Sequence, residues 1–144
     1  MGAMPAAGYY NSRRPYLIEN MKFTLDNPQG NYTFSNYGSG FLTINDQQYN
    51  ESVVIFPDEI FSGWPVNHAT DLKPEHFEIF RSKKPDIVLL GTGARQQFPD
   101  IALRRELQAM ALPLEVMDTA AACRTYNLLV SEGRDVGAAI MVFR

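Results

Sequence analysis

The sequence predicts one domain of the α/β or α+β class, rich in short strands in its first half and alternating between strands and helices in its second. The chain has 144 residues and is 45% apolar, which is enough for one core and too little for two ordinary domains. Strand-sized apolar runs occupy residues 32–64, and segments with helical spacing separate the strands from residue 74 onward. We find no fixed-period repeat or long charged block that would indicate a solenoid or a coiled coil.

The first half begins with a polar segment that contains prolines and has no helical periodicity. We expect a largely flexible N-terminal segment over 1–28, apart from a short β-like run at 21–25, and a folded domain over 29–144. Four β-like runs follow, and the Asn, Asp and Pro residues between them favour turns, so we expect a small antiparallel sheet. These runs are residues 32–34, 40–44, 52–56 and 60–64.

The second half alternates between the helical and the extended period. We expect helices over 74–81, 100–110 and 119–132, and strands over 86–90, 114–117 and 136–143. The middle helix should bury a stripe made of Ile101, Leu103, Leu107 and Met110. The last helix should bury Ala122, Cys123, Tyr126, Leu129 and Val130, and Gly133 is a stop signal after it.

Charge and composition exclude several classes of partner. The net charge is −3, with basic and acidic residues interspersed, so nucleic acid is not an expected partner. No apolar run approaches the roughly 20 residues of a membrane helix, and residues 1–15 lack the apolar centre of a secretory signal. Cys123 is the only cysteine, which excludes an internal disulfide. We therefore expect a soluble, cytoplasmic protein without membrane insertion.

The loop after the strand over 86–90 carries the clearest candidate for a binding site. Its glycines and the start of the last helix would direct backbone N–H groups into a shared crevice, where a carboxylate or phosphate would dock. The predicted site consists of Gly91, Thr92, Gly93, Arg95, Asp118, Thr119 and Arg124. The alternative is structural: a tight strand exit, and a helix capped by Asp118 or Thr119. A dinucleotide site is weakly supported, because its fingerprint needs a glycine where this chain has Gln96.

The other chemically active residues form no recognised catalytic or metal-binding pattern. Cys123 lies near a helix start beside Arg124, which would favour a reactive thiolate, but it also falls on the apolar stripe, and we favour a packed, inert thiol. His68 and His76 lack the spacing of a zinc site and are expected at the surface or in turns. Trp64 is expected in the core. No catalytic residue, metal or cofactor is predicted.

Several motifs together resemble the Mth-domain family, a domain of unknown function whose members include a mitochondrial complex I assembly factor and an adipogenesis-associated protein. The resemblance covers roughly residues 34–143. The motifs that carry it are Asn36-Tyr37-Gly38-Ser39-Gly40, Phe61-Ser62-Gly63-Trp64, Pro85-Asp86-Ile87-Val88-Leu89-Leu90-Gly91-Thr92-Gly93, Asp118-Thr119-Ala120-Ala121-Ala122-Cys123, Tyr126-Asn127 and Glu132-Gly133-Arg134. Because residues 1–15 contain no amphipathic basic helix of a mitochondrial presequence, the chain resembles a bacterial member.

The resemblance implies a fold and a class of function. The fold would be a three-layer α/β domain with a central mixed sheet flanked by helices, a last strand antiparallel to the others, and a small additional β element. The function would be that of a non-enzymatic assembly or protein-interaction module with an unidentified protein partner. The alternative is a small-molecule or anion-binding protein, or an enzyme, that uses the crevice between the Gly91-Thr92-Gly93 loop and the helix start at Thr119.

Overall fold

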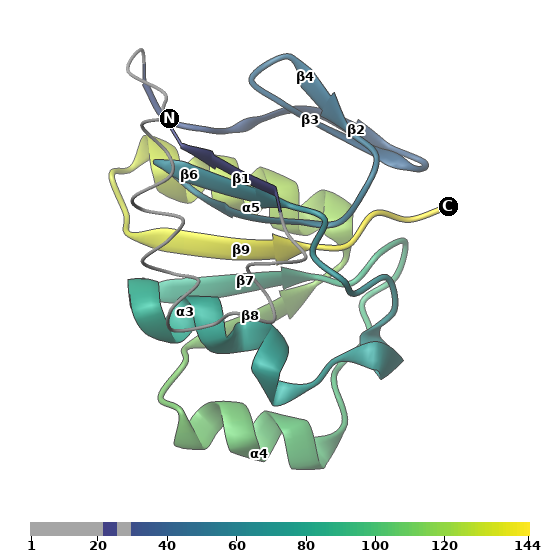
Figure 1. Cartoon of the computed structure of the whole chain (residues 1–144), viewed down its shortest axis with the longest axis vertical. Coiled ribbons are helices and arrows are strands. Elements are labelled where there is room, and N and C mark those ends of the chain that lie inside the picture. The colour runs from purple at the N-terminus through teal and green to yellow at the C-terminus, as the bar shows by residue number, and fades with distance from the viewer. Residues whose placement is uncertain (1–21, 26–29) are drawn as a thin grey trace.

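Six strands form the central mixed sheet in a computed structural model that describes residues 22–25 and 30–144 (Figure 1). They are β1 (Lys22–Leu25), β5 (Val53–Phe56), β6 (Glu59–Ser62), β7 (Ile87–Gly91), β8 (Leu114–Met117) and β9 (Val136–Ile140). Across the sheet the order is β1-β6-β5-β9-β7-β8. The β-like run at 21–25 thus contains strand β1, and the remainder of the segment predicted to be flexible, 1–28, lies outside the described residues.

Strand direction divides the sheet into a parallel and an antiparallel part. β7 pairs in parallel with both β8 and β9, whereas β9 is antiparallel to β5, and β5, β6 and β1 continue in antiparallel pairs. The expected mixed sheet is confirmed. A last strand antiparallel to all the others is wrong, because the chain passes from β8 to β9 through a helix, and such a crossover restores the original strand direction.

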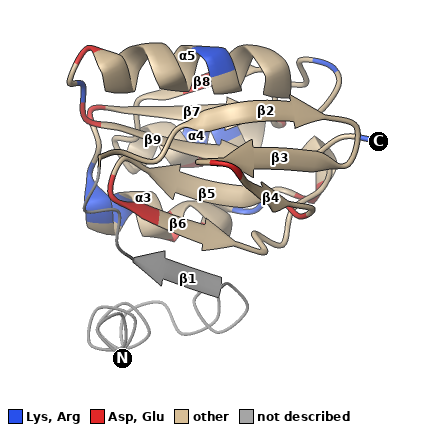
Figure 2. Cartoon of the chain, turned by 90° about the horizontal axis from the view of Figure 1, so that it is seen from above, with Lys and Arg blue, Asp and Glu red and all other residues tan. Residues whose placement is uncertain are grey.

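Helices cover both faces of this sheet and confirm the three-layer α/β arrangement (Figures 1 and 2). One face carries η1 (Ala69–Asp71), η2 (Pro74–Phe77), α3 (Glu78–Lys83) and α4 (Ile101–Ala109), and the other carries α5 (Thr119–Ser131). From β7 to β8 the chain moves outward across the sheet, and from β8 to β9 it moves back. Right-handed crossovers in opposite directions place α4 and α5 on opposite faces.

The helices agree with the sequence in their main features and differ in detail. The stretch over 74–81 is a 3₁₀ turn followed by a short α-helix. In α4, Leu103 and Leu107 are buried, but Ile101 is 55% exposed. Ile101 and Leu103 are two positions apart, which is about 200° around a helix, so they cannot share one face. All five residues expected to be buried on α5 are buried.

A second, three-stranded antiparallel sheet lies beside α5 (Figure 2). It consists of β2 (Phe34–Gly38), β3 (Phe41–Ile44) and β4 (Gln47–Tyr49). The small β element is therefore confirmed, but its membership differs from the sequence prediction, because β5 and β6 are buried and join the central sheet. The polar strand β4 was not predicted. Asn45 and Asp46, both with positive φ, make the tight turn that brings it against β3.

Two neighbouring residues of α5 attach the chain around the small sheet. The Tyr126 hydroxyl donates to the carbonyl oxygen of Tyr32 at 3.0 Å. The Asn127 amide accepts from the N–H of Phe34 at 2.9 Å and donates to its carbonyl at 2.8 Å, as a neighbouring strand would. The Phe34 ring packs edge-on against Tyr126. The Tyr-Asn motif therefore acts by fixing the small sheet to the helix.

Replacing Asn127 tests this attachment. Asn127→Ala should lower the free energy of unfolding by about 1–3 kcal/mol, because both polar groups of Phe34 lose their partner. Urea denaturation measures the loss, and amide hydrogen exchange should show faster exchange at Phe34 than in the central sheet. Asn50→Ala, at an exposed position, is the matched control. Equal effects of the two substitutions would contradict the assignment.

Candidate functional site

The glycines of the predicted site shape the exit of β7 for two different reasons. A Cβ on Gly91 would lie 3.1 Å from the Cβ of Ala122 and 3.2 Å from the Cα of Thr119, so glycine permits the start of α5 to pack against the strand end. Gly93 has φ +93°, a conformation that other residues rarely adopt. The Gly-Thr-Gly motif therefore serves a close helix approach and a sharp turn.

The buried hydroxyl of Thr119 connects three segments at this point. It accepts a hydrogen bond from the N–H of Gly93 at 2.8 Å and donates one to the carbonyl of Met141 at 2.5 Å. The N–H of Thr119 in turn donates to the carbonyl of Gly93 at 2.8 Å. The loop after β7, the first turn of α5 and the chain leaving β9 are thereby held together.

The remaining donors of the motif are also used within the fold. The N–H of Thr92 donates to Met117, and the Thr92 hydroxyl contacts the carbonyls of Arg95 and Met117 and accepts from the N–H of Gln97. Asp118 caps α5 by accepting from the N–H of Ala121 at 2.7 Å. The space between the glycine loop and the helix start is therefore filled by packing and hydrogen bonds.

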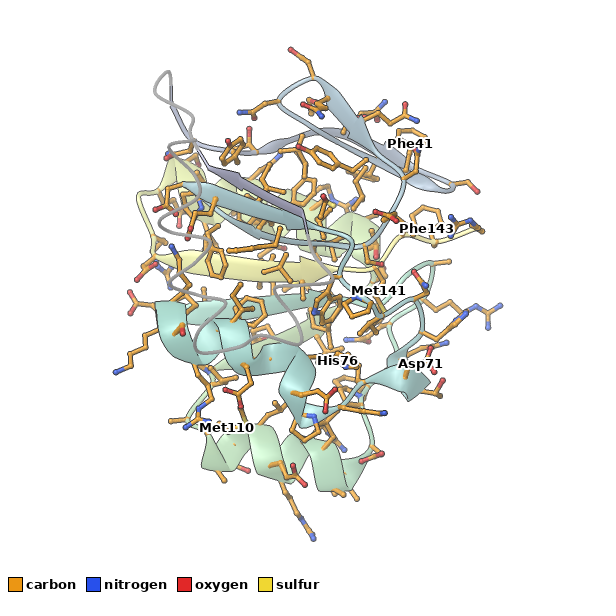
Figure 3. All side chains as sticks on the ribbon, in the orientation of Figure 1. Phe41, Asp71, His76, Met110, Met141 and Phe143 are labelled. Carbon is orange, nitrogen blue, oxygen red and sulfur yellow. The ribbon has the colours of Figure 1, made fainter. Side chains whose placement is uncertain are left out.

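A hollow lies on another side of the same loop. It is a cavity of about 310 Å³, and its lining residues are Asn67, His68, Thr92, Gly93, Ala94, Arg95, Gln97, Val142, Phe143 and Arg144. Figure 3 shows Met141 and Phe143 at this end of the molecule, where the chain leaves β9. The lining contains two arginines and a histidine and no carboxylate side chain. Such a surface favours an anion.

The structure therefore distributes the predicted site residues over three places. Thr92, Gly93 and Arg95 line the cavity, whereas Gly91, Asp118 and Thr119 do not. Arg124 is exposed, and its guanidinium donates to the Tyr37 hydroxyl at 2.9 Å on the small sheet. The sequence prediction missed the contributions of residues 67–68 and 142–144, which no motif marks and which reach the cavity only through the sheet topology.

Two other reactive side chains are buried in the core. Burial raises the pKa of the Cys123 thiol to about 12, against the opposing effect of Arg124. His68 is exposed, as a surface histidine should be, but His76 is only 5% exposed. Its Nδ1 accepts from the N–H of Lys73, its backbone carbonyl accepts from the Trp64 indole, and burial lowers its pKa. Trp64 is in the core, as expected.

A buried carboxylate lies apart from the cavity. Glu59 of β6 is 3% exposed and contacts the ammonium group of Lys83, which also lies 4.9 Å from the centre of the Phe56 ring. Burial raises the pKa of Glu59, and the hydrogen bond and charge of Lys83 oppose the rise. The pair joins the end of α3 to the antiparallel part of the sheet. Within residues 22–25 and 30–144, no cluster of His, Cys, Asp and Glu has the arrangement of a metal site.

The burial of Cys123 makes a direct chemical prediction. Iodoacetamide at pH 8 should not label native protein within minutes, because the thiol is inaccessible and its raised pKa keeps it protonated. Labelling should be complete in 6 M guanidinium. The variant Cys123→Ala/Ser131→Cys, with its thiol at an exposed position of the same helix, supplies the reactive control. Equally fast labelling of the native wild-type chain would establish a reactive thiol.

The Thr119 hydrogen bonds make a second prediction. Thr119→Val keeps the shape of the side chain but leaves the buried N–H of Gly93 and the carbonyl of Met141 without a partner, so unfolding free energy should fall by about 2–4 kcal/mol. Thr125→Val makes the same chemical change at a half-buried position of α5 and should cost less than about 0.5 kcal/mol. Chemical denaturation compares the two, and similar losses would refute the role of Thr119.

Similar proteins have been named in bacteria and animals. A Rattus norvegicus protein named NADH dehydrogenase (ubiquinone) 1 alpha subcomplex assembly factor 3 is 31% identical over 92% of this chain and 69% of its own length. A Francisella tularensis protein named 13 kDa major membrane protein is 27% identical over 75% of this chain and 89% of its own length. The chain spans 63% of the bovine assembly factor. No helix among the described residues has the length and apolar character needed to cross a bilayer.

Solved structures confirm the fold, and a family model confirms the membership. A Xanthomonas campestris protein is 37% identical, with a TM-score of 0.71 over 81% of this chain and 89% of that protein. A Bordetella pertussis Mth938-like domain is 28% identical, with a TM-score of 0.67 over 84% of this chain and 92% of that domain. Residues 34–141 match the family described as protein of unknown function (DUF498/DUF598). This chain therefore belongs to the DUF498/DUF598 family and has the Mth938-like fold.

Proposed function

We propose that the protein is a non-enzymatic interaction module that takes part in the assembly of a protein complex. The observation that carries the proposal is a pair of exposed apolar side chains at the start of α4: Phe98 is 57% exposed and Ile101 is 55% exposed. They flank the helix cap Asp100, and Phe98 lines a groove together with Leu114 and Val116 of β8, at the edge of the central sheet. A docking surface commonly includes exposed apolar side chains such as these. The name of the rat relative agrees with such a role.

The chemistry of the family motifs also supports this proposal. The side chains of Thr92, Asp118 and Thr119 form hydrogen bonds with the protein's own backbone. Asn127 likewise bonds to the backbone of the small sheet. Cys123, the most reactive residue type near them, is buried with a raised pKa. The hydrogen-bonding side chains of these motifs are thus used in folding, which leaves the exposed surface to bind a partner.

We place the module in the cytoplasm, in agreement with a lone thiol that is packed in the core. The Francisella relative carries the name of a membrane protein. Association with a membrane-bound partner would reconcile this name with the proposed location. Fractionation of the source cell, with and without a high-salt wash of the membranes, tests the location.

Capture experiments test the apolar pair. Phe98→Ser/Ile101→Ser should reduce by at least about tenfold the recovery of a partner that wild-type protein captures from the source cell, because it removes the exposed apolar surface. Exposed positions tolerate such changes within about 0.5 kcal/mol of stability, which thermal denaturation checks. Leu128→Ser, at a 56% exposed position on α5, is the matched control. Full recovery of every partner by the double variant would remove the basis of the proposal.

The cavity beside the glycine loop favours a second candidate function, the binding of a small carboxylate or phosphate. Its support is the concentration of basic groups on one lining, namely His68, Arg95 and Arg144, beside the backbone of Thr92 and Gly93. This site retains three of the sequence-predicted residues and shifts the bound anion away from the helix start. An enzyme acting on such an anion is included in this alternative.

A thermal-shift screen with nucleotides, sugar phosphates, acyl phosphates and dicarboxylates tests the cavity. A true ligand at a hundred times its Kd should stabilise the protein by about 2.7 kcal/mol through linkage. Arg95→Gln should abolish the shift, because it removes a cation from the lining and leaves the backbone contact with Thr92 in place. Arg134→Gln, outside the cavity, should not. No shift across the screen, or equal shifts in both variants, would count against this function.

A further inference from the structure

The outer edge of β8 is the feature that carries a further inference. β8 is an edge strand of the central sheet, and among the described strands it pairs only with β7. The carbonyls of Pro113 and Met117 accept hydrogen bonds from the β7 side, at Val88 and Thr92. Backbone groups alternate in direction along a strand, so those of Leu114 and Val116 point outward. The outward groups form a template for another strand.

One of these outward groups, the carbonyl of Val116, already accepts a hydrogen bond from a side chain instead of from a neighbouring strand. The side-chain amide of Gln96 donates to the carbonyl of Val116 at 2.9 Å, in the place where the N–H of an added strand would lie. Gln96 is exposed and comes from the loop after β7. Because this side chain is exposed, an incoming backbone N–H can replace its hydrogen bond with little loss of free energy.

A groove of about 390 Å³ runs along this edge and against α4. Its apolar lining residues are Phe98, Leu107, Leu112, Leu114 and Val116, and its polar lining residues are Gln96, Arg104, Gln108 and Glu115. The guanidinium of Arg104 lies 5.6 Å from the centre of the exposed Phe98 ring. The edge therefore offers backbone hydrogen-bonding groups beside an apolar depression with a polar rim, which is the combination used when a peptide adds a strand to a sheet.

The charge of Glu115 distinguishes between two occupants. Two copies of β8 paired antiparallel through Leu114 and Val116 would place Glu115 directly opposite the Glu115 of the second copy, and like charges directly opposite destabilise a strand pair. An exposed charged residue in an edge strand is also a common protection against self-pairing. A strand with a basic residue opposite Glu115 would instead be stabilised by this cross-strand pair. The occupant favoured by charge is a partner protein.

We propose that β8 accepts an extended segment of a partner protein as a seventh, antiparallel strand, with a basic residue opposite Glu115 between two aliphatic residues opposite Leu114 and Val116. The proposal rests on the interaction function proposed above and names its site and ligand class. Side chains alternate along a strand, so the two aliphatic residues lie on the face of Leu114 and Val116, which is that of α4 and the groove. Glu115 lines the groove at the strand edge, and by the same alternation its side chain turns to the opposite face, where the basic residue lies beside it.

A peptide titration of the full chain tests the strand pairing. The probe is the capped peptide Thr-Val-Lys-Val-Thr, followed by amide chemical shifts and hydrogen exchange. We expect the largest shifts and slowed exchange at Leu114 and Val116, and no effect from the same peptide N-methylated on both valines, because it cannot form the ladder. Gln96→Ala should bind the peptide about fivefold more tightly, since the competing side-chain hydrogen bond is gone.

A charge exchange tests the recognition of Glu115. Glu115→Lys should bind the Lys peptide about fivefold more weakly and prefer Thr-Val-Glu-Val-Thr, because the cross-strand pair changes sign. Glu51→Lys makes the same change at an exposed position outside the groove and should behave as wild type. Analytical ultracentrifugation should show that the wild-type chain forms no dimer through β8. A wild-type dimer that Glu115→Ser strengthens would indicate self-pairing of β8 instead.

The outcomes separate this inference from the broader function. Equal binding of the Lys and Glu peptides, shifts confined to other elements, or a dimer formed through β8 would overturn the strand-addition proposal. If Phe98→Ser/Ile101→Ser nevertheless lost its partner, the interaction function would stand with a different binding mode. If both experiments gave wild-type behaviour, the interaction function would fail as well.

Discussion

The hydroxyl of Thr119 is the contact on which the carboxyl end of the parallel strands depends. One oxygen atom accepts from the loop after β7 and donates to the chain leaving β9, while its own residue begins α5. These three segments come from different parts of the sequence, and no other described side chain bonds to both the loop and the β9 exit. Because Gly91 lets the helix approach so closely, the Thr119 hydroxyl connects the loop and the helix start directly, and no open crevice remains between them. The cavity then opens on the far side of the loop.

Helix α5 also organises the face of the molecule that lies opposite α3 and α4. Ala122, Cys123 and Val130 pack against the central sheet, while Tyr126 and Asn127 hold the chain around β2. A single helix thus divides its surface between two sheets. The sheet face under α4 has a separate apolar core. Leu114 and Val116 of β8 pack against that core, whereas the small sheet packs against the core under α5.

Much of the central fold follows from local pattern, and the failures have definable causes. Strand β8 and helix α5 were predicted within one residue, because apolar spacing and the cap at Asp118 mark them directly. β4 escaped prediction because its residues are polar and its pairing depends on a turn. β5 and β6 were recognised as strands, but nothing local distinguishes a strand of the small sheet from one that pairs with β9, eighty residues later.

The candidate site shows the same limit more sharply. The motif residues at 91–93 and 118–119 do come together, as parallel strands with adjacent carboxyl ends require, but hydrogen bonding occupies them. The basic lining depends in part on His68 and Arg144, which reach the loop only after the whole sheet is assembled. The burial of His76 likewise comes from Trp64 and Phe77 around it, which a pattern of histidine spacing does not contain.

The bond between Asn127 and Phe34 has a consequence for how such a chain can diverge. Asn127 recognises the main chain of β2 and not its side chains, so any residue with an N–H satisfies it at that hydrogen bond. Ser35, which is exposed, can therefore be replaced without removing this attachment, whereas the amide on α5 cannot be exchanged for an isosteric aliphatic group. At this contact the helix therefore depends on one side chain and the strand on none, so the two elements tolerate substitution unequally although they touch.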